Sequence, residues 1–307
     1  MTKMQSRPMV ATRAGTQGSS VVHKTANVAG IDVFYREAGI ADAPKLLLLH
    51  GYPASSHQYR NLLPALSDRF HLLAPDYPGF GNTGVPDPAG FAYTFEHLTD
   101  IVDQLLGQIG FTGPMGIYME GYGGAIGNRL VERHPDWLQW QVIQNANLYE
   151  EGLSPAWDPF KALWNDRNPE TEKGLMSLME PDGVKLVYTH GHQNPEAISP
   201  DNWNMDSFFL ARQNAKQAQL DLFYDFRTNI ELFPRWQESA RSQQPKTLIL
   251  WGRNDIFFTP TAGEMYLRDL PQAELLQFDS GHFVVEDGIG EVITAIDRFY
   301  VGRAAGG

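Results

Sequence analysis

The sequence predicts an α/β fold, with a mostly parallel sheet, helices on both faces of it and one helical insertion. Two observations predict it. Short apolar runs, each the length of a buried strand, alternate with amphipathic segments in the first part of the chain. This alternation stops near Asn147 and resumes at Lys246. Strands and helices in repetition build a parallel sheet, because each crossover helix packs back onto a face of that sheet.

The predicted strands differ in how deeply they are buried. Residues 31–36 alternate between apolar and polar, as a half-buried strand does. The run Lys45 to His50 is apolar throughout its middle, which is typical of a buried parallel strand. Further strands are predicted at residues 70–75, 115–119, 140–143, 246–251 and 273–278.

Two helices are predicted from apolar residues at helical spacing. The first covers residues 98–109, where apolar positions recur every three or four residues along one face. The second covers residues 289–300 and closes the chain. Residues 148–236 contain no strand-like run and are rich in Trp, Phe, Met, Asn and Pro, so we expect a helical cap domain there. The core domain is then expected at 28–147 and 237–302, after a flexible N-terminal tail at 1–27.

Composition narrows the functional classes. The chain has 307 residues, with 24 basic and 36 acidic ones, and a formal net charge of -12. A nucleic-acid partner is not expected, since phosphate binding needs clustered Lys and Arg. There is no cysteine, which excludes disulfides, thiolate metal sites and a cysteine nucleophile. With no membrane-length apolar stretch and no signal peptide, we expect a soluble, cytoplasmic monomer or homodimer that needs no cofactor.

Chemistry-bearing residues follow the predicted strands, at the sheet edge where open α/β folds place their ligands. His50-Gly51-Tyr52-Pro53 is a glycine-containing turn whose backbone N–H groups can face a cavity and stabilise a developing oxyanion. The loop at residues 76–83 is expected to be structural. Asp255 and His282 each follow a later strand, and both come after the sharp strand-to-helix turn at residues 119–124.

This order of motifs resembles the α/β-hydrolase superfamily, in which nucleophile, acid and base follow one another along the chain. It is most similar to the branch of haloalkane dehalogenases, fluoroacetate dehalogenases and epoxide hydrolases, over roughly residues 28–302. The resemblance implies the α/β-hydrolase fold, with an eight-stranded sheet and a helical cap after the sixth strand. It also implies that His282 is the base, that Asp255 orients it, and that Tyr52 and Tyr122 supply oxyanion N–H groups.

The same resemblance places a glycine where the nucleophile belongs. In that branch the turn reads like V-x-D-Y/W-G-G, and alignment on Tyr122-Gly123-Gly124 puts the Asp at Gly121. A register with Glu120 as the nucleophile would put Tyr118 and Tyr122 at flanking positions that need small residues. Glu120 is therefore expected to point elsewhere, although it would assist catalysis if it reached the cavity.

Glycine closes the covalent route and leaves three hypotheses. The protein is a hydrolase that uses His282 as a general base on water, or a ligand-binding protein without activity, or a variant of a hydrolase with Asp at position 121. Ala125 and Asn128 also depart from the family pattern, which favours a natural lineage over one engineered change. The retained Asp255 and His282 favour an enzyme.

The cap is expected to line a cavity for a small apolar substrate or ligand. Its candidate binding residues are large aromatic side chains, and the two tyrosines among them could donate a proton to an epoxide oxygen. These candidates are Trp157, Trp164, Tyr188, Trp203 and Tyr224. His190 and His192 alternate in a metal-like way, but they lack an acidic partner at ligand spacing, so we predict a surface loop and no metal site.

Overall fold

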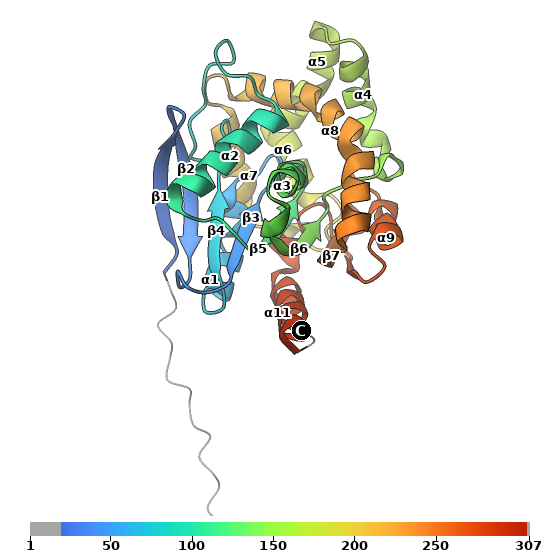
Figure 1. The fold of residues 1–307 in the computed structure, drawn as a ribbon. Helices are drawn as coiled ribbons and strands as arrows, with labels where there is room; N and C mark the ends of the chain where they lie inside the picture. The colour runs from blue at the N-terminus through green and yellow to red at the C-terminus, as the bar shows by residue number, and fades with distance from the viewer. Residues whose placement is uncertain (1–19, 306–307) are drawn as a thin grey trace, which may run out of the picture.

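The predicted α/β-hydrolase fold is confirmed. A computed structural model describes residues 20–305, and it contains one eight-stranded sheet in the order β1-β2-β4-β3-β5-β6-β7-β8 (Figure 1). β1 and β2 pair antiparallel, as do β2 and β4, while the remaining pairs are parallel. The strands are Val22–Val28, Ile31–Ala38, Lys45–Leu49, His71–Pro75, Met115–Glu120, Leu138–Gln144, Lys246–Gly252 and Glu274–Phe278.

The first strand corrects part of the predicted tail. Residues 22–27, assigned to the tail from the sequence, belong to β1, which pairs with β2 along its whole length. No apolar run marks this segment in the sequence, because β1 is an edge strand whose side chains are mostly exposed. Of the rest of the predicted tail, residues 1–19 lie outside the described residues.

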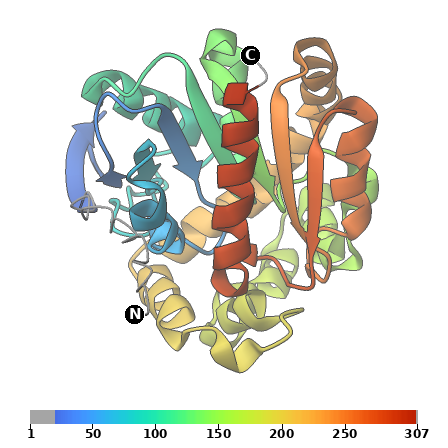
Figure 2. The same cartoon turned by 90° about the horizontal axis from the view of Figure 1, so that it is seen from below.

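Helices cover the two faces of the sheet. One face packs on α2 (Phe95–Ile109), α3 (Tyr122–Arg133) and α9 (Pro260–Asp269). The other packs on α1 (Leu62–Leu66), α10 (Val284–Asp287) and α11 (Ile289–Ala305), and Figure 2 shows α11 in red lying across that face. The helical periodicity is confirmed in α2, where Leu98, Ile101, Val102, Leu105 and Leu106 are all buried.

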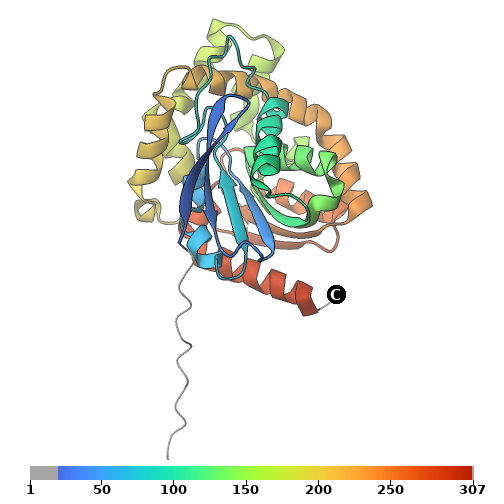
Figure 3. The same cartoon turned by 60° about the vertical axis from the view of Figure 1, so that its left-hand side comes forward.

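A helical segment separates β6 from β7, as expected for the cap. It contains α4 (Asp158–Asn165), α5 (Pro169–Met176), α6 (Pro181–Thr189), α7 (Pro200–Leu210) and α8 (Ala215–Gln243). In Figure 3 these yellow-green to orange helices curve over the upper ends of the strands. Helix α8 continues without a break past residue 236, the predicted end of the cap, so it belongs to both parts. The cap boundaries at 148 and 236 stay a prediction.

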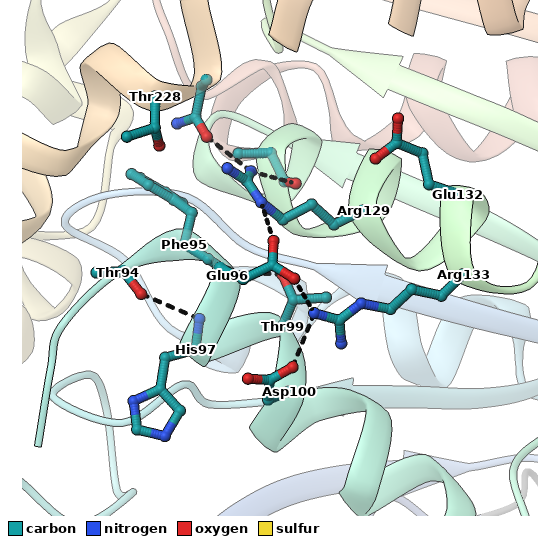
Figure 4. Close-up of polar contacts among 12 residues, drawn as sticks. Thr94, Phe95, Glu96, His97, Thr99, Asp100, Arg129, Glu132, Arg133 and Thr228 are labelled. Atoms are coloured by element: carbon teal, nitrogen blue, oxygen red, sulfur yellow. Dashed lines mark hydrogen bonds and ion pairs between the residues drawn. The ribbon is translucent and has the colours of Figure 1, made fainter. Parts of the chain in front are cut away.

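One buried arginine connects the helix after β5 to the cap. Arg129 of α3 is 3% exposed; its Nε donates to Glu96 of α2 at 3.0 Å and its Nη1 to Asn229 of α8 at 2.7 Å (Figure 4). Its guanidinium also lies 5.2 Å from the ring centre of Trp236. Since α3 begins directly after residue 121, these contacts fix the helix that carries the candidate site.

Replacing Arg129 with Met should lower the free energy of unfolding by about 2–3 kcal/mol, because Asn229 loses its charged donor in a buried setting. Arg133→Met is the matched control. Arg133 pairs with Glu96 and Asp100 nearer the surface, so its loss should cost less than about 1 kcal/mol. Urea unfolding of the two variants measures both values, and equal losses would contradict the role given to Arg129.

Candidate active site

The turn between β5 and α3 is built around Gly121. Strand β5 ends at Glu120 and helix α3 begins at Tyr122, so the chain reverses direction within a single residue. Gly121 has φ 50° and ψ -116°, a conformation that L side chains rarely adopt. Two residues later, a Cβ on Gly123 would lie 2.0 Å from the carbonyl oxygen of Leu49 in β3. Glycine at 123 therefore lets α3 approach the sheet closely. Such an approach is needed at the sharp strand-to-helix turn of α/β hydrolases, which is called the elbow below.

His282 and Asp255 meet at this turn, as the sequence predicts. Nδ1 of His282 lies 2.8 Å from Oδ2 of Asp255. The same carboxylate oxygen accepts a hydrogen bond from Asn145, and Oδ1 accepts the backbone N–H of Phe257. Both side chains are almost completely buried. Asp255 does not cap helix α9, because Thr259 is the residue before that helix.

His282 Nε2 faces the turn. A Cβ built on Gly121 would lie 3.3 Å from this nitrogen, so the two residues are in direct contact. A side chain at position 121 would thus point at the histidine. The elbow and the histidine form one site, although they are 161 positions apart in the chain.

Glu120 does not point away from the site, and this expectation was wrong. Its Oε1 lies 3.0 Å from His282 Nε2, and the residue is fully buried. Successive strand residues face opposite sides of a sheet, so Glu120 shares a face with Tyr118 and not with Met119. The loop after β8 carries His282 over to that side. Sequence alone could not reveal this contact, because it depends on where a distant loop crosses the strand end.

The two carboxylates control the protonation of the histidine. Burial by itself lowers the pKa of His282, but the opposite charges of Asp255 and Glu120, on either side of the ring, raise it to about 10. Burial raises the pKa of Glu120, and the charge of His282 opposes that rise. Near neutral pH the ring is therefore an imidazolium held between two buried carboxylates.

A narrow, almost entirely apolar cavity opens above Gly121. Its volume is about 30 Å³, close to the space that one water occupies in the liquid. The only ionisable group with a charge at neutral pH in its wall is His282. The cavity is lined by Tyr52, Gly121, Tyr122, Trp157, Phe160, Phe223, Phe257, Phe258 and His282.

Of the five predicted cap residues, Trp157 lines this cavity and the other four do not. Trp164 packs behind Trp157 and donates its indole N–H to the carbonyl of Phe223. Trp203 packs against Tyr188, whose hydroxyl donates to Asp206 at 2.6 Å. Tyr224 is covered by the guanidinium of Arg227, 3.7 Å from its ring centre.

The wall residues that sequence reasoning missed come from three places. Phe160 lies on α4 and Phe223 on α8, where many similar aromatic residues compete as candidates. Phe257 and Phe258 lie two and three residues after Asp255, and this closeness to a predicted site residue was the signal that could have found them. Because Tyr188 and Tyr224 are turned away, neither phenol faces a ligand in this cavity.

The two residues expected to supply oxyanion N–H groups both line the cavity. Tyr122 is the first residue of α3, so its N–H has no acceptor within the helix. Tyr52 follows β3, and its hydroxyl donates to the carbonyl of Leu178 in the cap. Its preceding residue, Gly51, packs against Gly121. The backbone on both sides of the cavity floor is thus held close to the elbow.

Comparison with known proteins identifies the family. The sequence profile of the alpha/beta hydrolase fold matches residues 44–289. The chain belongs to the α/β-hydrolase family. It is 36% identical over 268 residues to the "Uncharacterized hydrolase YNR064C" of Saccharomyces cerevisiae, covering 86% of this chain and 91% of that one.

One further sequence relative and one solved structure are similar to this α/β hydrolase. "Epoxide hydrolase 3" of Xenopus tropicalis is 24% identical, over 88% of this chain and 75% of that one. The solved haloalkane dehalogenase DbeA of Bradyrhizobium elkani has a TM-score of 0.75 at 19% identity, covering 92% of this chain and 100% of that one. The protein is an α/β-hydrolase-family hydrolase with dehalogenase-like and epoxide hydrolase-like relatives, as the sequence predicts.

Two further features of the described residues concern metals and membranes. Nδ1 of His192 lies 2.6 Å from Asp287, and Ser280 donates to the same carboxylate, so His192 connects the cap to the loop that carries His282.

No group of three His, Asp or Glu side chains between residues 20 and 305 is arranged to hold a metal ion. Within that same range, no helix is both long and apolar enough to cross a bilayer.

Replacing Gly121 with Ala should lower the free energy of unfolding by about 1–3 kcal/mol, because its backbone conformation strains an L side chain. The new Cβ would also lie 3.3 Å from both Gly51 Cα and His282 Nε2. Gly107→Ala in α2 is the control: nothing lies near its Cβ, and helix propensity should make it slightly stabilising. Denaturant unfolding gives both values, and a neutral Gly121→Ala would contradict the strained turn.

Proposed function

We propose that this protein hydrolyses a small apolar substrate with water as the direct nucleophile. In this proposal Gly121 stands at the position of the covalent nucleophile in related hydrolases and leaves room for water. His282 is the general base, Asp255 orients it, and the N–H groups of Tyr52 and Tyr122 stabilise the developing negative charge. The related dehalogenase and epoxide hydrolase suggest a substrate with an electrophilic carbon bound to halogen or to a strained oxygen.

One observation carries the proposal. His282 Nε2 and Gly121 share the wall of the cavity, and the nitrogen lies 3.3 Å from the place where a nucleophile's Cβ would stand. The cavity has the volume of a single water, which can therefore contact the histidine directly. In the reaction the water gives a proton to Nε2 while its oxygen bonds to the substrate carbon. The bond from that carbon to the leaving halide or oxygen breaks with its electron pair.

The size and apolar character of the cavity restrict the substrate. At about 30 Å³ the space is small for both water and a substrate, so we expect wall residues such as Trp157, Phe160 and Phe223 to move when a substrate enters. All three are cap residues. Aromatic walls favour an uncharged, apolar molecule, since few polar groups are there to replace its hydration.

Ligand binding without turnover is the second hypothesis. The missing side chain at Gly121 favours it, since the family's covalent step cannot occur without one. A purely binding protein would not need an imidazole in contact with the vacated position, and His282 is held there by a well-made hydrogen bond to Asp255. The third hypothesis is that this chain is a variant of a hydrolase with aspartate at position 121. The contacts of His282 described above are compatible with this hypothesis too.

Single-turnover hydrolysis in oxygen-18-labelled water tests the nucleophile. We expect panels of epoxides, haloalkanes and small esters to yield product that carries the label in the first turnover, because no enzyme oxygen enters it. A covalent carboxylate route would deliver unlabelled enzyme oxygen first. Intact-mass spectrometry should accordingly find no ester adduct on the protein.

His282→Ala should reduce kcat/KM by about 10²–10⁴-fold if the ring is the general base. His23→Ala on the exposed strand β1 is the matched control and should retain full activity. Ligand-induced stabilisation without turnover, unchanged in His282→Ala, would support the binding protein instead.

The rate should also depend on pH through His282. A base must be unprotonated to act, and the folded pKa of this ring is about 10. The rate should therefore rise about tenfold per pH unit up to that value and level off above it. A rate that levels off near pH 6.5, the ordinary value for histidine, would contradict the raised pKa of His282, and a rate that does not change with pH would contradict His282 as the base.

A further inference from the structure

We propose that Glu120 acts as a positioning residue that replaces the missing side chain of Gly121 as the partner of His282 Nε2. It thereby holds the ring in the protonated form and restricts hydrolysis to alkaline conditions. The effect on rate rests on the proposed function, whereas the effect on the histidine itself does not. The two can be tested separately.

The geometry makes Glu120 and a side chain at 121 competitors for one atom. His282 has two ring nitrogens, and Nδ1 is already bound to Asp255. Nε2 lies 3.0 Å from Glu120 Oε1 and 3.3 Å from the position of a Cβ on Gly121. With no side chain at 121, nothing separates the ring from Glu120.

The space for this carboxylate comes from the turn after β3. A Cβ on Gly51 would lie 2.5 Å from Glu120 Oε2, so only glycine at 51 leaves the carboxylate where it is. Both oxygens of Glu120 are inaccessible to solvent, and the groups that stabilise the carboxylate are His282 and the backbone N–H of Gly51. The charge of the imidazolium is thus the main compensation for a buried carboxylate that would otherwise be costly. The carboxylate is also shielded from the cavity, so it is not placed to attack a substrate.

The surrounding titratable groups are neutral. Burial lowers the pKa of His50, after β3, to about 3. Burial also raises the pKa values of Tyr59, Tyr77 and Tyr118, which approach Glu120 from η1 (Ser56–Tyr59), the loop after β4 and strand β5. The charge of the cluster is therefore set by Glu120, His282 and Asp255. Removing the ring proton would leave two buried carboxylates with no positive partner, which is why the proton is retained.

Nuclear magnetic resonance of His282, with isotope-labelled imidazole, tests the pairing without any substrate. We expect the ring of the natural protein to stay protonated well above pH 8. In Glu120→Gln its pKa should fall by about 1–3 units, because one opposite charge is lost. Asp279→Asn is the matched control. The exposed carboxylate of Asp279 lies on the loop that carries His282 and accepts hydrogen bonds from Gln193 and Asn254. Its replacement should leave the titration of His282 unchanged.

The natural protein alone can overturn the proposal. A ring that titrates near pH 6.5 would show that Glu120 does not hold the proton, and no variant has to fold for this result. An equal shift in Asp279→Asn and Glu120→Gln would likewise reject a specific role for Glu120. Neither outcome depends on finding a substrate, so both are distinguishable from failure of the proposed hydrolysis.

In the hydrolysis assay, Glu120→Gln should move the rising part of the pH–rate profile to lower pH. The size of this move should equal the fall in the pKa of His282 seen in the titration. At pH 7 its rate should then rise about tenfold or more over the natural protein, because more of the base is unprotonated. A rate that falls at every pH, together with a lowered ring pKa, would show that Glu120 takes part in catalysis and would reject its role as a restraint.

The competition also predicts how the covalent route could be restored. Asp placed at 121 alone would add a third carboxylate to the cluster, and the repulsion would raise its pKa and weaken it as a nucleophile. We expect Gly121→Asp combined with Glu120→Gln to form an ester with a haloalkane or epoxide about tenfold faster than Gly121→Asp alone. Intact-mass spectrometry in a His282→Gln background would detect the adduct. Equal rates of ester formation in Gly121→Asp with and without Glu120→Gln would contradict the proposed competition between the two positions.

Discussion

The site depends on one interaction, the contact of a buried imidazolium with two buried carboxylates. Asp255 and Glu120 hold His282 from opposite sides of its ring, at 2.8 and 3.0 Å. None of the three could be buried alone without a large loss of hydration free energy. Together they place one positive charge between two negative ones, in a region where nearby histidine and tyrosine side chains are neutral. Loops after β5, β7 and β8 are brought together by this cluster.

The backbone around the cluster is built to let it form. Gly121 accepts a conformation that L side chains rarely adopt, Gly123 lets α3 approach β3, and Gly51 leaves room for the carboxylate of Glu120. Arg129 then connects α3 to α2 and to α8, so the cap and the elbow are held by the same side chain (Figure 4). The glycines thus do more than form turns, since each removes a Cβ that would collide with a neighbouring element.

The proposed absence of a nucleophile at Gly121 would change the chemistry that this arrangement favours. In a hydrolase with a carboxylate at the elbow, that carboxylate faces the histidine and attacks the substrate. Here the carboxylate that faces His282 stands one residue earlier in the chain, below the cavity floor and out of reach of a ligand. Under the proposed function, the charge balance around the histidine is kept while the covalent step is absent. The aromatic wall above Gly121 remains suited to a small apolar molecule.

The sequence by itself determined the fold, and it predicted that Asp255 and His282 meet at the turn around Gly121. These follow from local patterns: apolar runs for strands, helical spacing for α2, and turn residues directly after strand ends. The edge strand β1 was missed because exposed side chains leave no apolar pattern. Only the tertiary structure decided that Glu120 reaches His282 and that Phe160, Phe223, Phe257 and Phe258 line the cavity while Tyr188 and Tyr224 do not. Those contacts join residues from distant elements, and their relative positions are set by packing that no local pattern records.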